Sequence, residues 1–169
     1  METEVFSAQL ADEVLSPEPP SIPLERPQGQ RQSVWLFPKS EHQLLSANFS
    51  LAEFRCRCHA QRCHTTLVHP RLVESLQTLR QLVARPLVIT SGYRCITYNR
   101  VVGGRPRSFH TRGMAADVVC ESLEFLAELT ELARGIPAIG AVGQYPARGF
   151  LHLDVRPRGT AGQIEQWSG

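Results

Sequence analysis

The chain has little of several features that would point to a specialised partner or environment. No apolar run approaches the roughly 20 residues that a membrane-spanning helix needs, so no membrane span is expected. The N-terminal segment METEVFSAQLADEVL contains no apolar core of a secretory signal, so a cytoplasmic location is the default expectation. Charges are nearly balanced, with 18 basic and 16 acidic residues, and this balance argues against a dedicated nucleic-acid-binding protein.

Lysine and cysteine are also used sparingly. Lys39 is the only lysine, which we attribute to genome composition rather than to chemistry. The five cysteines are an odd number and cannot all pair within the chain, and without an export signal a reducing compartment is expected. The hydrophobic fraction of 42% is ordinary, so 169 residues suffice for one folded domain with a tail.

Residues 1–45 differ in composition from the rest of the chain. Residues 15–33 carry five prolines and show little periodicity, which predicts an extended, largely disordered tail. Within it, VWLFP (34–38) is expected either to dock on the domain or to form a short edge strand. The folded domain is therefore predicted to span residues 46–169.

The domain itself combines helical periodicity with short strands. Three helices are predicted: one after the capping box of Ser50 and Glu53, one that begins at Pro70 and ends before Pro86, and one over residues 122–135. Short strands are predicted within residues 87–94, 115–119, 138–146 and 149–157, the last two as antiparallel neighbours. This order indicates an α+β fold, with a small antiparallel sheet packed by helices.

Three side chains have the chemistry of a metal site. In FLHLDV, strand alternation puts His152 on the same face as Asp154. His110, Asp117 and His152 would supply two imidazoles and one carboxylate, a known catalytic zinc set, and Gly113 would let His110 and Asp117 approach one ion. A hydrogen-bonded histidine–aspartate pair and an ordinary core histidine remain the alternatives at this stage.

Three motifs, in order, resemble a known family. SFHTRGMAADV is similar to the S-x-H-x-x-G-x-A-x-D motif of zinc D-Ala-D-Ala carboxypeptidases and related peptidoglycan peptidases. ITSGYRCITYNRVVGG resembles the segment that precedes this motif, and GFLHLDVRP resembles the strand with the last zinc histidine. The resemblance covers roughly residues 46–158 and is strongest to a small bacterial and phage-associated branch. It implies the Hedgehog/DD-peptidase fold, with one catalytic Zn²⁺ bound by His110, Asp117 and His152.

The resemblance also implies roles for further residues. Arg94 matches an arginine beside the metal, which would bind a substrate carboxylate or stabilise a developing oxyanion; a surface salt bridge is its alternative. Ser108 would contact the ligand histidine or the substrate, or else cap its loop. Asn99 is expected to hold a turn.

The catalytic base is where the sequence departs from the family. Some branches have a glutamate where this chain has Gly149, and others have a histidine where it has Phe150. Asp154 is the nearest acidic candidate for the base. Its alternatives are a carboxylate that orients a ligand, or a partner of Arg156.

A second group of metal-binding residue types lies in FRCRCHAQRCH. Cys56, Cys58 and Cys63, with His59 or His64, could form a structural zinc site; a disulfide and plain loop residues are the alternatives. Cys95 and Cys120 are expected to be small buried apolar residues.

The predicted function is hydrolysis of peptide bonds in peptidoglycan stem peptides by a zinc metallopeptidase of the carboxypeptidase or endopeptidase type. The alternative is an inactive zinc-containing structural or cell-wall-binding protein, for example a phage or prophage component. Because no export signal is evident, action at the cell wall would require release or export by another route, such as a phage lysis system.

Overall fold

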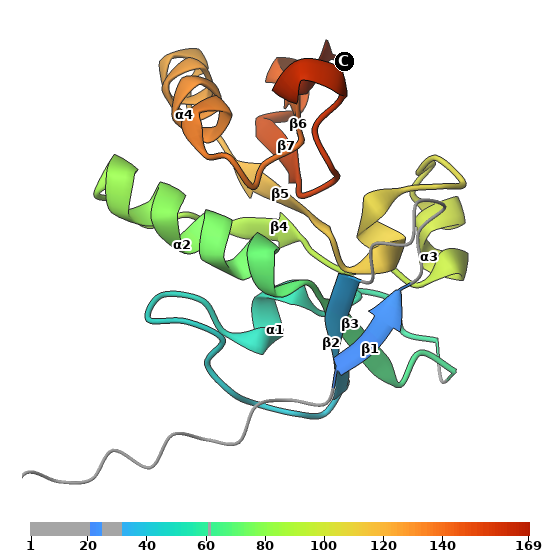
Figure 1. Ribbon diagram of the computed structural model, residues 1–169. Helices are drawn as coiled ribbons and strands as arrows, with labels where there is room; N and C mark the ends of the chain where they lie inside the picture. The colour runs from blue at the N-terminus through green and yellow to red at the C-terminus, as the bar shows by residue number, and fades with distance from the viewer. Residues whose placement is uncertain (1–20, 25–31, 61) are drawn as a thin grey trace, which may run out of the picture.

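The computed structural model describes residues 21–24, 32–60 and 62–169, which form two sheets and the helices around them (Figure 1). The strands are β1 (Ser21–Leu24), β2 (Gln32–Pro38), β3 (Thr65–Val68), β4 (Ile89–Ser91), β5 (Ala115–Val119), β6 (Ala141–Tyr145), β7 (Phe150–Asp154) and β8 (Glu165–Ser168). The α-helices are α1 (Leu51–Phe54), α2 (Pro70–Val83), α3 (Ile96–Val101) and α4 (Leu123–Gly135). Short 3₁₀ turns occupy η1 (Phe109–Arg112), η2 (Pro146–Arg148) and η3 (Thr160–Gly162).

The larger sheet has the strand order β4-β5-β7-β6-β8. Its neighbours are antiparallel except for β6 and β8, which run parallel. The predicted α+β class and the predicted antiparallel pair of β6 and β7, joined through η2, are thereby confirmed. Strand β8 was not predicted, because EQWS has neither the length nor the alternation that would identify a strand.

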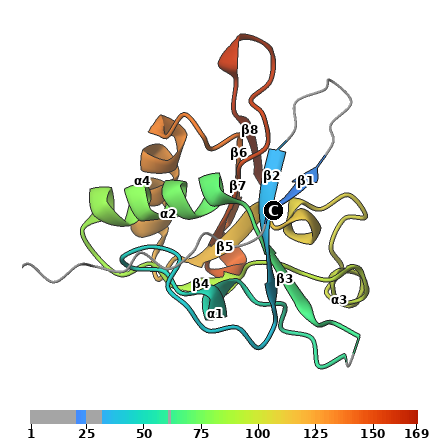
Figure 2. The same ribbon diagram turned by 60° about the horizontal axis from the view of Figure 1, so that its bottom comes forward.

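Helices α2 and α4 lie together on one side of this sheet, and α3 lies on the other side of β5 (Figures 1 and 2). The covered face carries the core: Val118, Leu151 and Leu153 pack in one cluster with Leu76 and Leu129 of the two helices. Since strand side chains alternate, the remaining positions of β5 and β7 point to the opposite face. None of the described helices is both long and apolar enough to cross a membrane.

Local signals set the helix starts as predicted. The Glu53 carboxylate accepts a hydrogen bond from the Ser50 N–H at 2.7 Å, which completes the capping box of α1. The Ser122 hydroxyl caps α4 by accepting from the Phe125 N–H. Helix α2 starts at Pro70, and the His69 ring, which had no predicted role, accepts from the Arg71 N–H.

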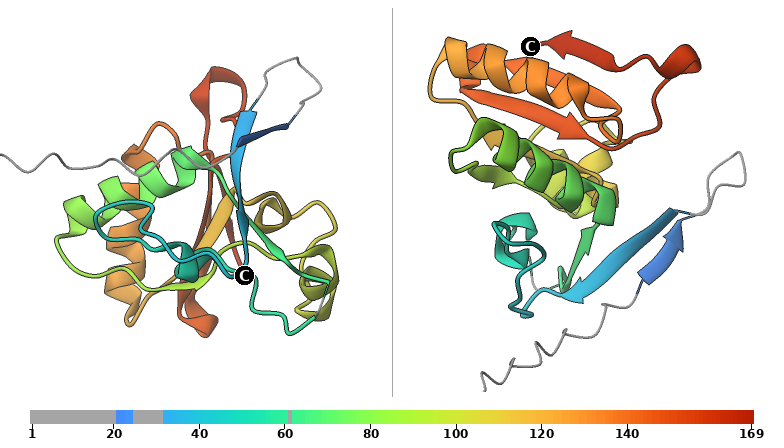
Figure 3. Two further views of the ribbon diagram at one scale, coloured as in Figure 1. Left: turned by 90° about the horizontal axis from the view of Figure 1, so that it is seen from below. Right: turned by 60° about the vertical axis from the view of Figure 1, so that its left-hand side comes forward.

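Residues before 46, the predicted start of the domain, also belong to one of the two sheets. VWLFP forms most of β2, which pairs with β1 on one side and β3 on the other, so it is a central strand and not an edge strand (Figure 3). Val34 and Phe37 are buried, and burial of apolar side chains explains why this segment joins the domain. The prediction of a disordered tail otherwise concerns residues 1–20 and 25–31, which lie outside the described residues.

Candidate functional site

The candidate site is built on one row of residues across the larger sheet. Strand register places Ser91, Asp117, His152, Gly143 and Trp167 side by side on β4, β5, β7, β6 and β8. Directly paired residues have Cβ atoms only about 5 Å apart, so this register brings Asp117 and His152 together. The sheet alone therefore fixes the relative positions of two of the predicted ligands, Asp117 and His152.

The third predicted ligand comes from the turn before β5. His110 lies in η1, and Gly113 ends this turn with φ +66°, the left-handed region that glycine adopts without strain. A Cβ at Gly113 would also lie 2.4 Å from the Leu67 carbonyl oxygen, so β3 holds the turn in place by close backbone contact. This geometry confirms the expected folding back of His110 onto Asp117.

The three side chains meet within hydrogen-bonding distance. Asp117 Oδ1 lies 2.8 Å from His152 Nδ1 and 3.2 Å from His110 Nε2, and the two ring nitrogens are 3.1 Å apart. His110 is 2% exposed, and the side chains of Asp117 and His152 are 7% and 11% exposed. We call these three residues the His–Asp–His site.

In each histidine, the ring nitrogen that points away from Asp117 has a hydrogen-bond partner, and this partner determines the tautomer. The Gly92 carbonyl can only accept, so His110 Nδ1 carries a proton and donates to it at 2.7 Å. His152 Nε2 lies 3.2 Å from Asp154 Oδ2 and likewise donates outward. Both inner nitrogens then present lone pairs to the Asp117 carboxylate, an arrangement that requires a positive charge at the centre.

The pKa shifts assign a positive charge to His152, a negative charge to Asp117 and no charge to His110. Burial keeps the pKa of His110 below its ordinary value. Burial acts in the same direction on His152, but its hydrogen bonds to Asp117 and Asp154 raise its pKa overall. Burial tends to raise the pKa of Asp117, yet hydrogen bonds from the two histidines hold it well below its usual range. When no other cation lies between the three side chains, protonated His152 supplies the positive charge.

The donor set fits a tetrahedral zinc ion. Ligand distances of about 2.0–2.2 Å place the donor atoms of such a site roughly 3.3 Å from one another. The observed separations of 2.8–3.2 Å require only a small outward movement of the side chains. Three protein donors leave a fourth position open, as in catalytic zinc sites.

Arg94 lies beside the three donors. Its guanidinium forms an ion pair with Asp117 Oδ2, and its Nε donates to the Ser91 hydroxyl at 2.7 Å. The turn that carries it is fixed by Gly92, where a Cβ would lie 2.5 Å from the Phe54 Cα. Close backbone packing against α1 is thus the physical reason for glycine in the S-G-Y-R segment. The structure brings Arg94 to the site and rules out its alternative as an isolated surface ion pair.

Asp154 does not occupy the position of a free base. It is fully buried, its Oδ2 accepts from His152 Nε2, and Arg156 donates to both of its oxygens. Burial would raise its pKa, but these hydrogen bonds lower it. Because it contacts the outer side of the His152 ring, its geometry favours the alternative of a carboxylate that orients His152 over that of a catalytic base.

Ser108 and Asn99 have contacts with their own loops. The Ser108 carbonyl accepts from Thr111, and its hydroxyl caps no backbone group of η1. Asn99 is buried and donates to the Arg105 carbonyl at 2.9 Å, as expected for a residue that holds a turn. The predicted contact of Ser108 with the ligand histidine is not among the hydrogen bonds of the described residues.

This arrangement lies within a region of the chain that matches a known protein family. The Peptidase M15 family matches residues 47–154, which is more than half of the chain and includes all three donors of the His–Asp–His site. The chain belongs to the Peptidase M15 family. This M15 chain is also 34% identical, over 97 residues, to the peptidoglycan L,D-endopeptidase MepK of Escherichia coli K12, and equally to that of Shigella flexneri.

These matches cover 53% of the M15 chain and 52% of MepK, so the chain spans about half the length of the curated relatives it matches. They confirm the predicted resemblance to the peptidoglycan peptidase family. The relatives named here are bacterial proteins and give no support to a phage association.

Two features of the M15 chain were missed from the sequence. Trp167 lies against His152 with ring centroids 5.4 Å apart, and its Nε1 donates to the Tyr145 hydroxyl at 2.9 Å. No motif marks it, because it reaches the site only through the register of β8. Cys95, predicted to be a buried apolar residue, instead lies half-buried in a cluster with Cys56, Cys58 and Cys63. Cys120 is buried as predicted.

Proposed function

We propose that the M15 chain is a zinc-dependent endopeptidase that hydrolyses peptide bonds of peptidoglycan stem peptides. The observation that carries this proposal is the convergence of His110 Nε2, Asp117 Oδ1 and His152 Nδ1, with both outer ring nitrogens already engaged. The L,D-endopeptidase named among its relatives favours an endopeptidase over a carboxypeptidase.

In this proposal His110, Asp117 and His152 hold the ion, which would supply Lewis-acid polarisation of the scissile carbonyl and an acidified water. Gly92 and Asp154 hold the two rings with their lone pairs inward. Arg94 neutralises the second oxygen of Asp117, and its guanidinium would donate to charge that develops on the carbonyl oxygen. Trp167 packs beside the His152 ring, with the ring centroids 5.4 Å apart.

A second candidate function is zinc-dependent binding of the wall without turnover. It is favoured by the engagement of Asp154, which is the only further carboxylate hydrogen-bonded to the three donors in the described part of the chain. Hydrolysis needs a group that accepts the proton of the attacking water. The two functions therefore predict the same metal site but opposite results with substrate.

The deciding experiment digests purified peptidoglycan and defined stem peptides with zinc-loaded protein and identifies the products by mass spectrometry. Internal cleavage that a chelator abolishes, and that His110→Ala and His152→Ala both lack, is the expected result. The matched control is His42→Ala, which removes an exposed histidine outside the site. Release of terminal D-alanine alone would identify a carboxypeptidase. Bound zinc and bound peptidoglycan with no product would establish the binding function.

A further inference from the structure

A second group of metal-binding side chains lies outside the His–Asp–His site. Cys56, Cys58 and Cys63 lie in the loop after α1, and Cys95 lies immediately before α3. The four Sγ atoms all lie within 4.8 Å of one another, although Cys95 comes 32 positions after Cys63 in the chain. We call this group the four-cysteine cluster. His59 and His64, the imidazoles considered from the sequence, do not belong to it among the described residues.

The sulfur spacing matches a bound ion and not a disulfide. A tetrahedral zinc site with Zn–S bonds of about 2.3 Å holds its sulfur atoms roughly 3.8 Å apart. Cys58 Sγ and Cys95 Sγ are 3.7 Å apart, whereas a disulfide requires about 2.05 Å. All five cysteines are free thiols.

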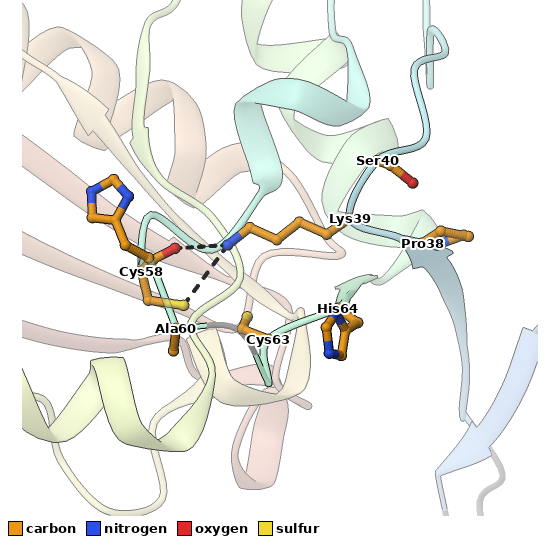
Figure 4. Close-up of a pocket in the computed structure, with 8 residues that line it drawn as sticks. Pro38, Lys39, Ser40, Cys58, Ala60, Cys63 and His64 are labelled. Carbon is orange, nitrogen blue, oxygen red and sulfur yellow. Dashed lines mark hydrogen bonds between the residues drawn. The ribbon is translucent and has the colours of Figure 1, made fainter.

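The surroundings supply hydrogen-bond donors to the sulfur atoms. The Cys95 N–H points to Cys56 Sγ at 3.3 Å, and the Tyr98 N–H points to Cys95 Sγ at 3.4 Å. The ammonium group of Lys39, the only lysine of the chain, lies 3.8 Å from Cys58 Sγ and donates to the Cys58 carbonyl at 2.8 Å (Figure 4). Four thiolates around a divalent ion carry a net charge of about −2, and these donors offset it.

The cluster can be reached from solvent. A pocket of about 520 Å³ opens beside it, and Figure 4 shows Lys39, Cys58 and Cys63 in its lining. This pocket gives an ion a route to Cys58 and Cys63, while Cys56 closes the buried side.

We propose that the four-cysteine cluster is a structural zinc site in which Cys56, Cys58, Cys63 and Cys95 supply all four ligands. Four protein ligands leave no open position, which is the arrangement of structural and not of catalytic zinc. The ion would tie the loop after α1 to the start of α3. Because Cys95 follows Arg94 directly, the same link would hold the turn that places Arg94 beside Asp117.

The test distinguishes the two candidate metal sites in the 169-residue chain. His110→Ala/His152→Ala removes the donors of the His–Asp–His site, and Cys58→Ser/Cys95→Ser removes two of the cluster. Cys120→Ser is the matched control, since Cys120 lies outside the cluster. We expect elemental analysis to find about one zinc per chain in the histidine variant and in the cysteine variant, and about two in the control. Cobalt substituted into the histidine variant should show the intense thiolate charge-transfer absorption of a sulfur-ligated ion.

A measurement without cysteine substitutions covers the case in which those variants do not fold. A mercurial thiol reagent added to the zinc-loaded histidine variant should release its zinc in proportion to the thiols that react. A folded histidine variant that binds no metal under reducing conditions, or whose cobalt form lacks thiolate bands, would overturn the proposal, as would iron in place of zinc. These outcomes are independent of cleavage: loss of peptidoglycan cleavage with an intact thiolate site would refute the proposed function alone.

Discussion

The two clusters of potential ligands in this M15 chain are built in opposite ways. In the His–Asp–His site, Asp117 and His152 are direct partners on neighbouring strands of one sheet, and His110 lies in the short turn before β5. The four-cysteine cluster stands on a loop and on the residue before α3, with no strand in it. The first has three donors, an adjacent arginine and a tryptophan over one ring, whereas the second has four donors and backbone N–H groups around them.

The two constructions suit different roles: the first suits catalysis, and the second suits stabilisation of the fold. A rigid sheet holds donor atoms at fixed distances, which a catalytic site with an open position needs. Loops gain order from a metal ion that binds them, so a site made from loops contributes mainly to folding. Substitutions at one cluster should therefore change activity, and substitutions at the other should change stability.

Outside the three donors themselves, the largest expected effect is on turnover and comes from Arg94. Arg94→Ala removes the guanidinium beside Asp117 and should lower kcat/KM on peptidoglycan peptides about 10²–10³-fold, with the zinc content unchanged. Arg94→Lys keeps the charge but not the two-pronged geometry and should recover only part of the activity. Arg100→Ala, an exposed arginine on α3, is the control. Equal losses in both alanine variants would mean that α3 as a whole was disturbed.

The next effect is on stability and comes from the four-cysteine cluster. Cys58→Ser/Cys95→Ser should lower the free energy of unfolding by about 2 kcal/mol, or roughly 4–8 °C in Tm, because the ion no longer ties the loop to α3. Thermal unfolding followed by circular dichroism in the presence of zinc measures this change. His110→Ala/His152→Ala is the comparison and should shift Tm less. A larger shift in the histidine variant would reverse the roles assigned to the two clusters.

A third effect concerns the orientation of His152. Asp154→Asn removes the charge that accepts from His152 Nε2 and should weaken zinc binding at the His–Asp–His site about 10–100-fold. Competition with a fluorescent chelator measures it. Glu165→Gln is the matched control, because Glu165 pairs with Arg156 as Asp154 does but does not contact His152. Unchanged affinity in Asp154→Asn would show that the ring is held by packing alone.

The same carboxylate should make stability depend on pH. Hydrogen bonds from His152 and Arg156 hold the pKa of Asp154 below its ordinary value despite burial. A group with a lowered folded-state pKa stabilises the fold above its unfolded pKa of about 3.9, and this contribution is lost as the pH falls further. Urea unfolding of the metal-free protein should thus weaken below about pH 4, with a shallower decline in Asp154→Asn. Parallel pH curves for the two proteins would contradict this account.

The smallest effect is expected at Ser108. Its hydroxyl caps no backbone group of η1, so Ser108→Ala should change stability by less than about 0.5 kcal/mol and kcat/KM by less than about twofold. Steady-state kinetics on a stem peptide tests this. A marked rise in KM would restore the substrate contact that the sequence motif implies.

Local sequence signals were sufficient for much of the fold. The capping box at Ser50, the proline at the start of α2 and the glycine after η1 act within a few residues, and each element begins or ends where they indicate. Strand alternation correctly put His152 and Asp154 on one face of β7. Trp167 and β8 were missed because their contribution depends on parallel pairing with β6, which no local pattern encodes.

By itself, the sequence determined the α+β class and the family motifs, and it singled out the three residues of the His–Asp–His site. The fold class follows from residue periodicity, and the three residues follow from the resemblance of two segments to the motifs of a known family. Only the tertiary structure decided that Asp154 faces Arg156 and the outer side of His152, and that Cys95 joins the three cysteines of a distant loop. Such contacts are fixed by strand register and by packing between segments that are distant in the chain. The spacing of residues along the sequence does not indicate how close two such segments lie in space.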